Sequence, residues 1–274
     1  MTGLAERIDA AWTTLGPQEQ RVAGFLRARP DESALYNSSE LARLTGVSKA
    51  TVSRLYRRLG FAASSEVREL LRARRSAGLP VVVEQAGARL PALLAQELAS
   101  LQRLAADLDP DALEAAARTL AEADRVLVIG LRSGLPVATT LRLALAQARP
   151  DVVLAPGQGQ SIAEEVAGLG RGDAVVLVAL RRRPAVAARL LAALEASPAA
   201  VVVVADPSLP ASRGAAQRFT VPIESAGAFD SYSAAAALVA ALADAVLRHR
   251  GPAGAARVEA VDAALRALDE LEGD

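Results

Sequence analysis

The spacing of hydrophobic residues divides the chain into a helical first part and a second part in which strands and helices alternate. Before residue 80, apolar residues recur at intervals of three and four, which is typical of helices that bury one face. After Asp109, short runs of Val, Leu and Ile alternate with helix-like segments, as in a parallel sheet that is covered on both faces. The pattern predicts a fold of the α/β class behind an all-helical N-terminal domain.

Five segments of the second part are predicted to be strands. They are 125–129, 151–154, 174–180, 200–205 and 218–221. The helix-like segments around them are 136–148, 160–169, 185–196, 209–216 and a long Ala-rich stretch from about 230 to 249. Strands that alternate with helices indicate a doubly wound α/β domain with a five-stranded parallel sheet.

Breaks in the pattern give the expected domain boundaries. A helical domain spans 1–78, ending with a helix over about 65–76, and a leucine-rich helical connector covers 79–108. The α/β domain is expected over 109–251. The sequence Gly-Pro-Ala-Gly that starts at Gly251 then separates it from a C-terminal helix within 252–274.

Residues 38 to 59, SSELARLTGVSKATVSRLYRRL, predict two short helices joined by a tight turn. Asn37 caps the first helix with Glu40 at capping-box spacing, and Ser48 caps the second. Gly46 supplies the positive φ that a sharp turn needs. Apolar residues of the second helix face inward and its arginines face outward. This is the helix-turn-helix geometry, which places the second helix in the major groove of DNA.

The outward face of the second helix carries most of the candidate DNA contacts. The candidates are Ser38, Lys49, Thr51, Ser53, Arg54, Arg57 and Arg58. Those in the first half of the second helix are expected to reach base edges, and Arg57 and Arg58 to contact phosphate. The alternative is an ordinary helical hairpin with a solvated basic face.

The distribution of charge favours DNA binding although the formal net charge is zero. Residues 1–80 carry 13 Lys plus Arg and 8 Asp plus Glu, so the remaining chain has an equal excess of acidic residues. A basic N-terminal part on an acidic body suits a DNA-binding domain attached to another domain.

The absence of cysteine and the single histidine exclude disulfides, thiolate catalysis and histidine-rich metal sites. No cofactor or metal is therefore expected. The chain also lacks an apolar run of the ~20 residues needed to span a bilayer and a secretory signal, so a cytoplasmic protein is expected.

Three stretches resemble the RpiR family of bacterial transcriptional regulators. They are LGPQEQRVAGFLRARP, SSELARLTGVSKATVSRLYRRLGF, and VLVIGLRSG with the strand pattern behind it. The resemblance implies a DNA-binding domain followed by a sugar isomerase (SIS) domain that binds phosphosugars. It also implies the strand order 2-1-3-4-5.

In a sheet of that order the loops after the first and third strands meet at the edge where ligands bind. Each loop precedes a helix, whose free N–H groups favour an anion, and arginine binds phosphate or carboxylate with paired hydrogen bonds. The candidate effector-binding residues are Arg132, Ser133, Gly134, Arg181, Arg182, Arg183 and Ser231. A solvated loop or an interface ion-pair cluster is the alternative for the arginines. Asp206 and Asp230 also fall near this edge, and Asp230 is expected to cap the long helix.

One loop departs from the family pattern. SIS domains that bind phosphosugars carry a loop close to S-x-S-G-x-T after the third strand, where this chain has Arg181-Arg182-Arg183-Pro184. The expected effector is therefore a small anionic metabolite, either a sugar phosphate or another carbohydrate derivative.

The predicted function is that of a DNA-binding transcriptional regulator and not of an enzyme. The alternatives are a SIS-domain sugar-phosphate isomerase and a DNA-binding protein that needs no ligand. An isomerase needs a general base and a ring-opening acid, but His249 lies late in a helix and Glu164 and Glu165 lie inside another. Because one such helix reads only a few base pairs, a homodimer or homotetramer on a palindromic operator is expected. The α/β domain and the connector, over 90–106, are its expected contact surfaces.

Overall fold

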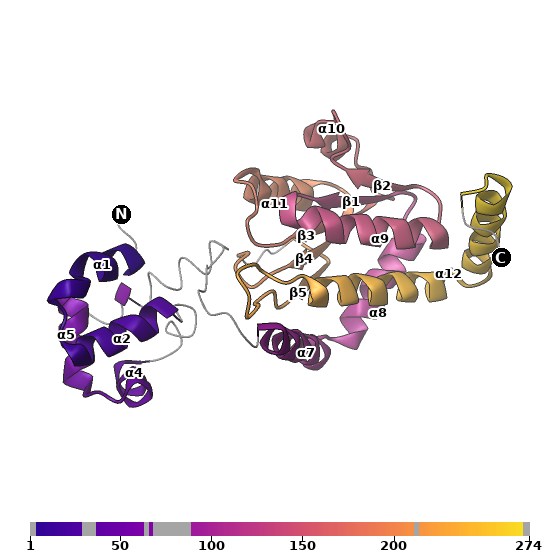
Figure 1. Ribbon diagram of the computed structural model, residues 1–274. Helices are drawn as coiled ribbons and strands as arrows, with labels where there is room; N and C mark the ends of the chain where they lie inside the picture. Colours follow the sequence, from indigo (N-terminus) through magenta and orange to yellow (C-terminus); the bar gives the residue numbers. More distant parts are fainter. Residues whose placement is uncertain (1–3, 29–36, 63–65, 68–88, 211–213, 271–274) are drawn as a thin grey trace. The chain divides into compact units, whose positions relative to one another are not determined.

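The computed structural model describes residues 4–28, 37–62, 66–67, 89–210 and 214–270 (Figure 1). The chain divides into two compact units. The first ends at Leu90 and also includes Gly227–Phe229, and the second consists of Pro91–Ala226 and the residues from Asp230 onward. No helix of the described residues is long and apolar enough to cross a membrane. Most of the helix expected over 65–76 lies outside these residues.

The N-terminal unit is built from short helices around one apolar core. Its elements are α1 (Leu4–Ala11), the 3₁₀ turn η1 (Trp12–Thr14), α2 (Pro17–Ala28), α4 (Ser38–Thr45) and α5 (Lys49–Arg58). The fully buried side chains at its centre include Ile8, Val22, Leu26, Leu41, Val52 and Leu55. Because the core residues of α5 recur at intervals of three, the opposite side of this helix faces solvent.

The predicted caps of α4 and α5 are confirmed. Asn37 Oδ1 accepts the backbone N–H groups of Ser39 (2.9 Å) and Glu40 (3.0 Å), and Glu40 Oε2 accepts the N–H of Asn37 (2.7 Å). Gly46 ends α4 in the left-handed conformation with φ 66°. Ser48 Oγ accepts the N–H of Thr51 at 3.1 Å. These caps fix the tight turn that sets the direction of α5.

The second unit contains a five-stranded parallel sheet in the predicted order, β2-β1-β3-β4-β5. The strands are β1 (Val126–Gly130), β2 (Val152–Ala155), β3 (Ala174–Ala179), β4 (Ala200–Ala205) and β5 (Gln217–Thr220). Each begins and ends within one residue of its predicted bounds. The order reverses at β1 and β3, which lie side by side at the centre of the sheet.

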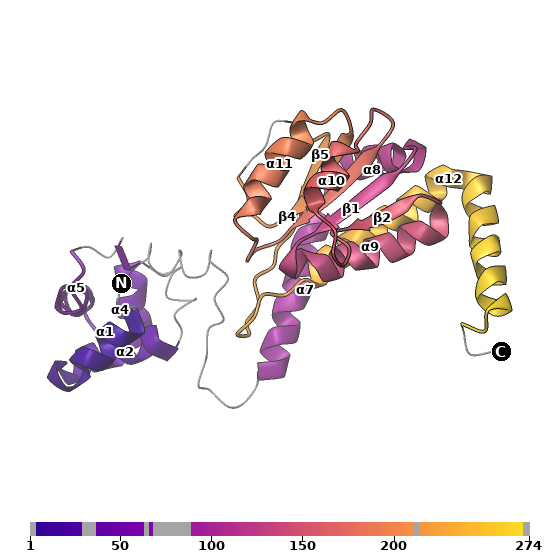
Figure 2. The ribbon, with the colours of Figure 1, turned by 90° about the horizontal axis from the view of Figure 1, so that it is seen from above.

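Helices cover both faces of this sheet (Figures 1 and 2). One face packs on α8 (Pro110–Glu122), α9 (Leu135–Ala148) and α12 (Ser233–Ala267), and the other packs on α10 (Ile162–Ala167) and α11 (Val186–Ala196). Val128 and Val176 point into the first core, and Leu127 and Ile129 into the second. The connector α7 (Arg89–Asp107) precedes α8, and the 3₁₀ turn η2 (Arg132–Gly134) precedes α9.

Two predictions about helices near the end of the chain have different outcomes. The predicted break at Gly251 is confirmed, because that residue has φ 52° and ψ −131° and α12 changes direction there (Figures 1 and 2). The helix predicted over 209–216 is wrong for the described residues 209–210 and 214–216, which are not helical. Pro210 and Gly214 lie in this segment, and both disfavour a helix.

Candidate functional sites

The outer side of α5 presents unpaired basic residues. Lys49, Arg54 and Arg57 are exposed, and Ser53 beside them is half-buried. Lys49 and Arg57 have no side-chain partner among the residues that the structure describes. Arg54 makes only one long hydrogen bond, from Nη2 to Thr51 Oγ1 at 3.4 Å. A guanidinium group with no counter-charge can exchange its water for a phosphate or a base edge at little cost.

A groove runs along this basic face. Gly16 and the first turn of α2, from Pro17 to Glu19, form one wall, and Arg54, Arg57 and Arg58 of α5 line the other. The burial of Val52 beneath them holds the arginines on the outer side. The face therefore combines positive charge with a hollow that is open to solvent.

Arg58 differs from its neighbour Arg57 because it is already engaged. Its Nη1 donates to the carbonyl of Thr14 at 2.7 Å and to Glu19 Oε2 at 2.9 Å. Glu19 also accepts the backbone N–H of Gly16 at 3.1 Å, so its carboxylate is fixed at the start of α2. A phosphate contact by Arg58 would compete with this ion pair.

Two predicted DNA contacts are corrected by the structure. Thr51 is only 1% exposed, and its hydroxyl lies 2.9 Å from Ser48 Oγ and 3.4 Å from Gln18 Oε1 of α2. The helical periodicity of α5 placed Thr51 on a flank, but the packing of α2 covers that flank. Ser38 is 8% exposed. Both side chains are largely buried, although Thr51 is among the residues that line the groove.

The second predicted site lies at the carboxyl ends of β1 and β3. Gly130 of β1 is in register with Val178 of β3, so the loops that follow the two strands begin side by side. Gly134 then passes so close to β3 that a Cβ atom on it would lie 2.3 Å from the carbonyl oxygen of Val178. Only glycine permits this approach. It brings η2 and the start of α9 against the edge of the sheet, with Ser133 half-buried.

An arginine in each loop has a backbone conformation that is uncommon for a residue with a side chain. Arg132 has φ 50° and Arg182 has φ 65°. Such conformations typically cost about 1 kcal/mol or more and tend to cluster at functional sites, although Asp151 and Asp269 also have a positive φ. Arg132 is exposed and Arg182 is half-buried. Neither guanidinium group has a partner in the described part of the chain.

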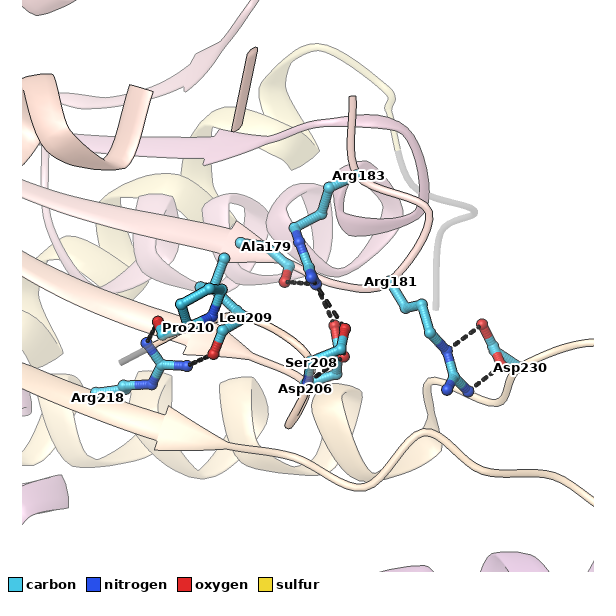
Figure 3. Close-up of polar contacts among 9 residues, drawn as sticks. All are labelled: Ala179, Arg181, Arg183, Asp206, Ser208, Leu209, Pro210, Arg218 and Asp230. Atoms are coloured by element: carbon cyan, nitrogen blue, oxygen red, sulfur yellow. Dashed lines mark hydrogen bonds and ion pairs between the residues drawn. The ribbon is translucent and has the colours of Figure 1, made fainter. Parts of the chain in front are cut away.

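Arg181 is instead tied to a carboxylate (Figure 3). Its side chain is 9% exposed, and two hydrogen bonds join it to Asp230, from Nε to Oδ2 (3.2 Å) and from Nη2 to Oδ1 (2.5 Å). Burial lowers the pKa of Arg181, but the hydrogen bonds and charge of Asp230 raise it by more, so the pKa lies above its ordinary value. The guanidinium group of Arg181 therefore stays charged.

Arg183 forms a second ion pair beside the first (Figure 3). Its Nη1 donates to Asp206, which is 1% exposed, and to the carbonyl of Ala179 at 3.1 Å, while Nη2 donates to Ser208 Oγ at 2.9 Å. Two of the four predicted arginines are thus neutralised by aspartates, whereas no carboxylate of the described residues pairs with Arg132 or Arg182.

The turn that leads into α12, residues Asp230 to Ser233, is joined to the connector α7. Ser231 Oγ donates to Glu97 Oε2 at 2.7 Å, and Ser233 Oγ donates to the same oxygen. The expectation that Asp230 caps α12 is wrong, since the cap residue is Tyr232 and it makes no side-chain bond. Sequence reasoning also missed Glu97, because nothing in a leucine-rich helix marks one glutamate as the partner of a turn 134 residues later.

The residues weighed for acid–base chemistry lie away from this edge. His249 is 16 residues along α12 from Ser233, or about 24 Å, and its Nε2 lies 2.8 Å from Glu114 Oε2. Glu165 lies 3.8 Å from Arg125, which immediately precedes β1 at the amino end of the sheet, and Glu164 next to it is exposed.

Comparisons with known proteins agree with this division into two units. Residues 2–77 match the family model described as the helix-turn-helix domain of the rpiR family. The sugar isomerase domain of an RpiR transcription factor from Sphaerobacter thermophilus is 22% identical, with a TM-score of 0.57, over 67% of this chain and all of that one. The Vibrio vulnificus NanR protein, solved with ManNAc-6P, is 19% identical with a TM-score of 0.57, over 97% of this chain and 99% of that one. No curated protein matches the chain.

The two structural neighbours establish the fold of the second unit, which is that of a sugar isomerase domain. The family model identifies the first unit, whose capped α4–turn–α5 segment carries the basic face. The chain therefore carries a helix-turn-helix domain of the rpiR family over residues 2–77, followed by a domain with the sugar isomerase (SIS) fold.

Proposed function

We propose that a small anionic effector binds at the carboxyl ends of β1 and β3 and changes the affinity of this regulator for DNA. One observation carries the proposal: Arg132 and Arg182, one from each adjacent loop, keep unusual backbone conformations and have no partner among the described residues. The amino ends of α9 and α11 follow the same loops, and the positive end of a helix dipole favours an anion. The proposed contacts also include Ser133 and the backbone of Gly134.

The proposed effector class is a carbohydrate derivative with a phosphate or carboxylate group. The NanR structure contains a sugar phosphate, ManNAc-6P, which makes this class the first to test. Arginine binds both phosphate and carboxylate through two parallel hydrogen bonds, whereas a loop of hydroxyl groups provides no charge. Since Arg181 and Arg183 are already paired with aspartates, Arg132 and Arg182 are the arginines that favour an anionic group over a neutral one.

For DNA, we propose that α5 enters the major groove. Lys49, Ser53 and Arg54 then contact base edges, Arg57 contacts phosphate, and Arg58 does so only by competing with Glu19. The support is the exposure of these residues and the burial of the opposite side of α5.

The proposed functional segments are the DNA-binding domain over 1–78, the helical connector over 79–108, the effector-binding domain over 109–251 and the C-terminal helix within 252–274.

The proposed assembly is a symmetric dimer, or a dimer of dimers, on a palindromic operator. A recognition helix of ten residues contacts only a few base pairs, so two copies are needed to specify a site. The connector α7 is the proposed contact surface between copies. Leu94 and Leu98 are 54% and 62% exposed on it, and Glu97 is its one charged residue between Arg89 and Arg103.

We do not propose isomerase activity. His249 and Glu165 contact Glu114 and Arg125, and none of these four residues belongs to the loops at the carboxyl edge. A ring-opening reaction would need an acid and a base within hydrogen-bond reach of the substrate. An assay for turnover of sugar phosphates by the purified protein tests this, and the expected result is no turnover.

The test of the regulatory proposal begins with a footprint on the DNA upstream of the protein's own gene. Operator affinity is then measured with and without a panel of sugar phosphates and sugar acids. The double variant Arg132→Gly/Arg182→Gly should lose the response to the active compound, because glycine removes the guanidinium groups while tolerating the positive φ.

The matched control for this variant is Arg171→Gly, an exposed arginine in the turn before β3 at the opposite edge of the sheet. It should respond as the wild type does. If no compound changes operator affinity in the wild-type protein, the SIS domain is not an effector domain. The ligand-independent DNA-binding protein then becomes the better description.

A further inference from the structure

The carboxylate of Asp230 occupies the position at which an anionic ligand would bind Arg181. Both oxygens of Asp230 accept hydrogen bonds from this guanidinium group, and the two side chains are only 9% and 13% exposed. A phosphate or a carboxylate of a ligand offers the same pair of acceptor oxygens. Asp230 therefore presents to Arg181 the same chemistry as the effector proposed above.

Asp230 is also part of a short turn that touches the connector. The turn from Asp230 to Ser233 is bonded on one side to Arg181 and on the other, through both serine hydroxyls, to Glu97 of α7. Nearby, Arg103 of α7 forms an ion pair with Glu224 at 3.2 Å. A change in the position of the turn is therefore transmitted directly to α7, which in the sequence links the SIS domain to the helix-turn-helix domain.

Resting on the proposed function, we propose that the anionic group of the effector displaces Asp230 from Arg181 and thereby loosens the hold of the Asp230–Ser233 turn on α7. The exchange replaces one two-point ion pair of Arg181 by another, so the guanidinium group is never left buried without a counter-charge. The displaced carboxylate regains hydration. Asp230 is then a competitor for the effector, and its strength sets the effector concentration at which the regulator responds.

The proposal also explains why arginines with and without a paired aspartate occur together at the carboxyl ends of β1 and β3. Arg132 and Arg182 are available to attract the anion first, whereas Arg181 binds it only by giving up Asp230. Arg183 keeps its own carboxylate, Asp206, which is buried and bonded to Ser208 as well. Only the Arg181–Asp230 pair is joined to α7 through neighbouring residues, so it is the pair whose exchange can carry a signal.

The test compares full-length wild-type protein with Asp230→Asn. Binding of inorganic phosphate, glucose 6-phosphate and gluconate is measured by titration calorimetry at constant ionic strength, so that phosphate and carboxylate groups are compared. Removal of the competing charge should tighten the binding of at least one probe roughly tenfold or more. Asp230→Glu, which keeps the charge, should stay close to the wild type.

The matched control is Asp173→Asn. Asp173 is as exposed as Asp230, at 13%, and is also paired with an arginine, Arg125, but immediately before β3 at the amino end of the sheet. It should leave probe affinity unchanged. Circular dichroism of each variant checks that the fold is retained.

A second variant tests the connection to α7 independently of Asp230. Glu97→Gln weakens the hold on the two serines, so the turn should move more readily and the probe should bind severalfold more tightly. In hydrogen exchange, peptides that cover 91–104 should exchange faster when the probe is added to the wild type. In Asp230→Asn they should exchange faster without it.

The outcomes separate the two proposals. If a probe binds the wild type and Asp230→Asn binds it no more tightly, the displacement is wrong while the effector site stands. The same conclusion follows if α7 exchanges at an unchanged rate on binding. If no probe binds the wild type or either variant, both proposals are overturned. Binding that appears only in the variants supports Asp230 as the competitor.

Discussion

Arginine is used in two different ways in the two domains of this chain. On α5, Arg54 and Arg57 are exposed and no carboxylate of the described residues neutralises them. At the carboxyl edge of the SIS sheet, Arg181 and Arg183 are largely buried and each is bound to an aspartate. The residue type is the same, but the free energy needed to bring an anion to it differs.

The difference indicates how each site selects its ligand. An exposed arginine exchanges salt ions for phosphate, so its binding depends strongly on ionic strength and little on the shape of the ligand. A paired arginine binds an anion only if the new contacts outweigh those lost with the aspartate. The α5 face is therefore suited to a long polyanion, and the sheet edge to a small ligand with a defined geometry.

The largest effect is expected for the stability of the variant Asp206→Asn, which tests whether the aspartate paired with Arg183 stabilises the fold. Asp206→Asn removes a buried charge that Arg183, the hydroxyl of Ser208 and its backbone N–H (2.9 Å) all contact. We expect the free energy of unfolding of the SIS domain to fall by about 3 kcal/mol, because Arg183 is left without its counter-charge. Urea denaturation followed by circular dichroism measures this loss.

Asp262→Asn is the control for this change. Asp262 pairs with Arg266 on α12, but the two side chains are 48% and 73% exposed, so the loss should be about 0.5 kcal/mol. A small loss for Asp206→Asn, similar to that of the control, would remove the distinction between paired and free arginines.

The next largest effect is expected for operator binding by the variant Arg54→Ala. Loss of contacts to a base edge should weaken operator binding by about 1–3 kcal/mol and relax the preference at one base position. Competition binding against single-base variants of the operator measures both quantities. Arg43→Ala, an exposed arginine on α4, should leave base preference unchanged. A loss that is uniform over all DNA sequences would assign Arg54 to phosphate instead.

Most of the fold could be predicted from the sequence because its signals are local. The caps at Asn37 and Ser48, the left-handed Gly46 and the apolar runs of the strands each depend on a few neighbouring residues. The strand order came with the family resemblance. The helix predicted over 209–216 does not form in the described part of that segment, because Pro210 and Gly214 both disfavour a helix.

The sites were harder to predict because their contacts join distant segments. Helical periodicity placed the arginines of α5 correctly on the outside, but it could not show that Gln18 of α2 covers Thr51. The sequence predicted that arginines lie at the carboxyl ends of β1 and β3. It did not predict which of them pair with an aspartate. Asp230 pairs with Arg181 across 49 residues, and that pairing depends on the path of the turn before α12.

Among the phosphate contacts, Arg57→Ala measures the behaviour of a free arginine. If Arg57 binds one phosphate, the slope of log affinity against log salt concentration should fall by about 0.9. Affinity should fall for all DNA sequences alike, since phosphate contacts carry no sequence information. An unchanged slope would mean that Arg57 lies outside the interface.

The smallest expected effect concerns Arg58. Like Arg54 and Arg57 it is exposed, with 53% of its side chain accessible, but like Arg181 and Arg183 it is paired with a carboxylate, that of Glu19. Arg58→Ala should lower the salt slope by less than Arg57→Ala, since part of its charge is already compensated. Glu19→Gln should do the opposite and steepen the slope by less than 1, because it frees Arg58 while glutamine can still accept the N–H of Gly16. If Arg58→Ala and Arg57→Ala lower the slope equally, pairing with a carboxylate does not limit how an arginine of this protein binds an anion. The proposed role of Asp230 would then lose its physical basis as well.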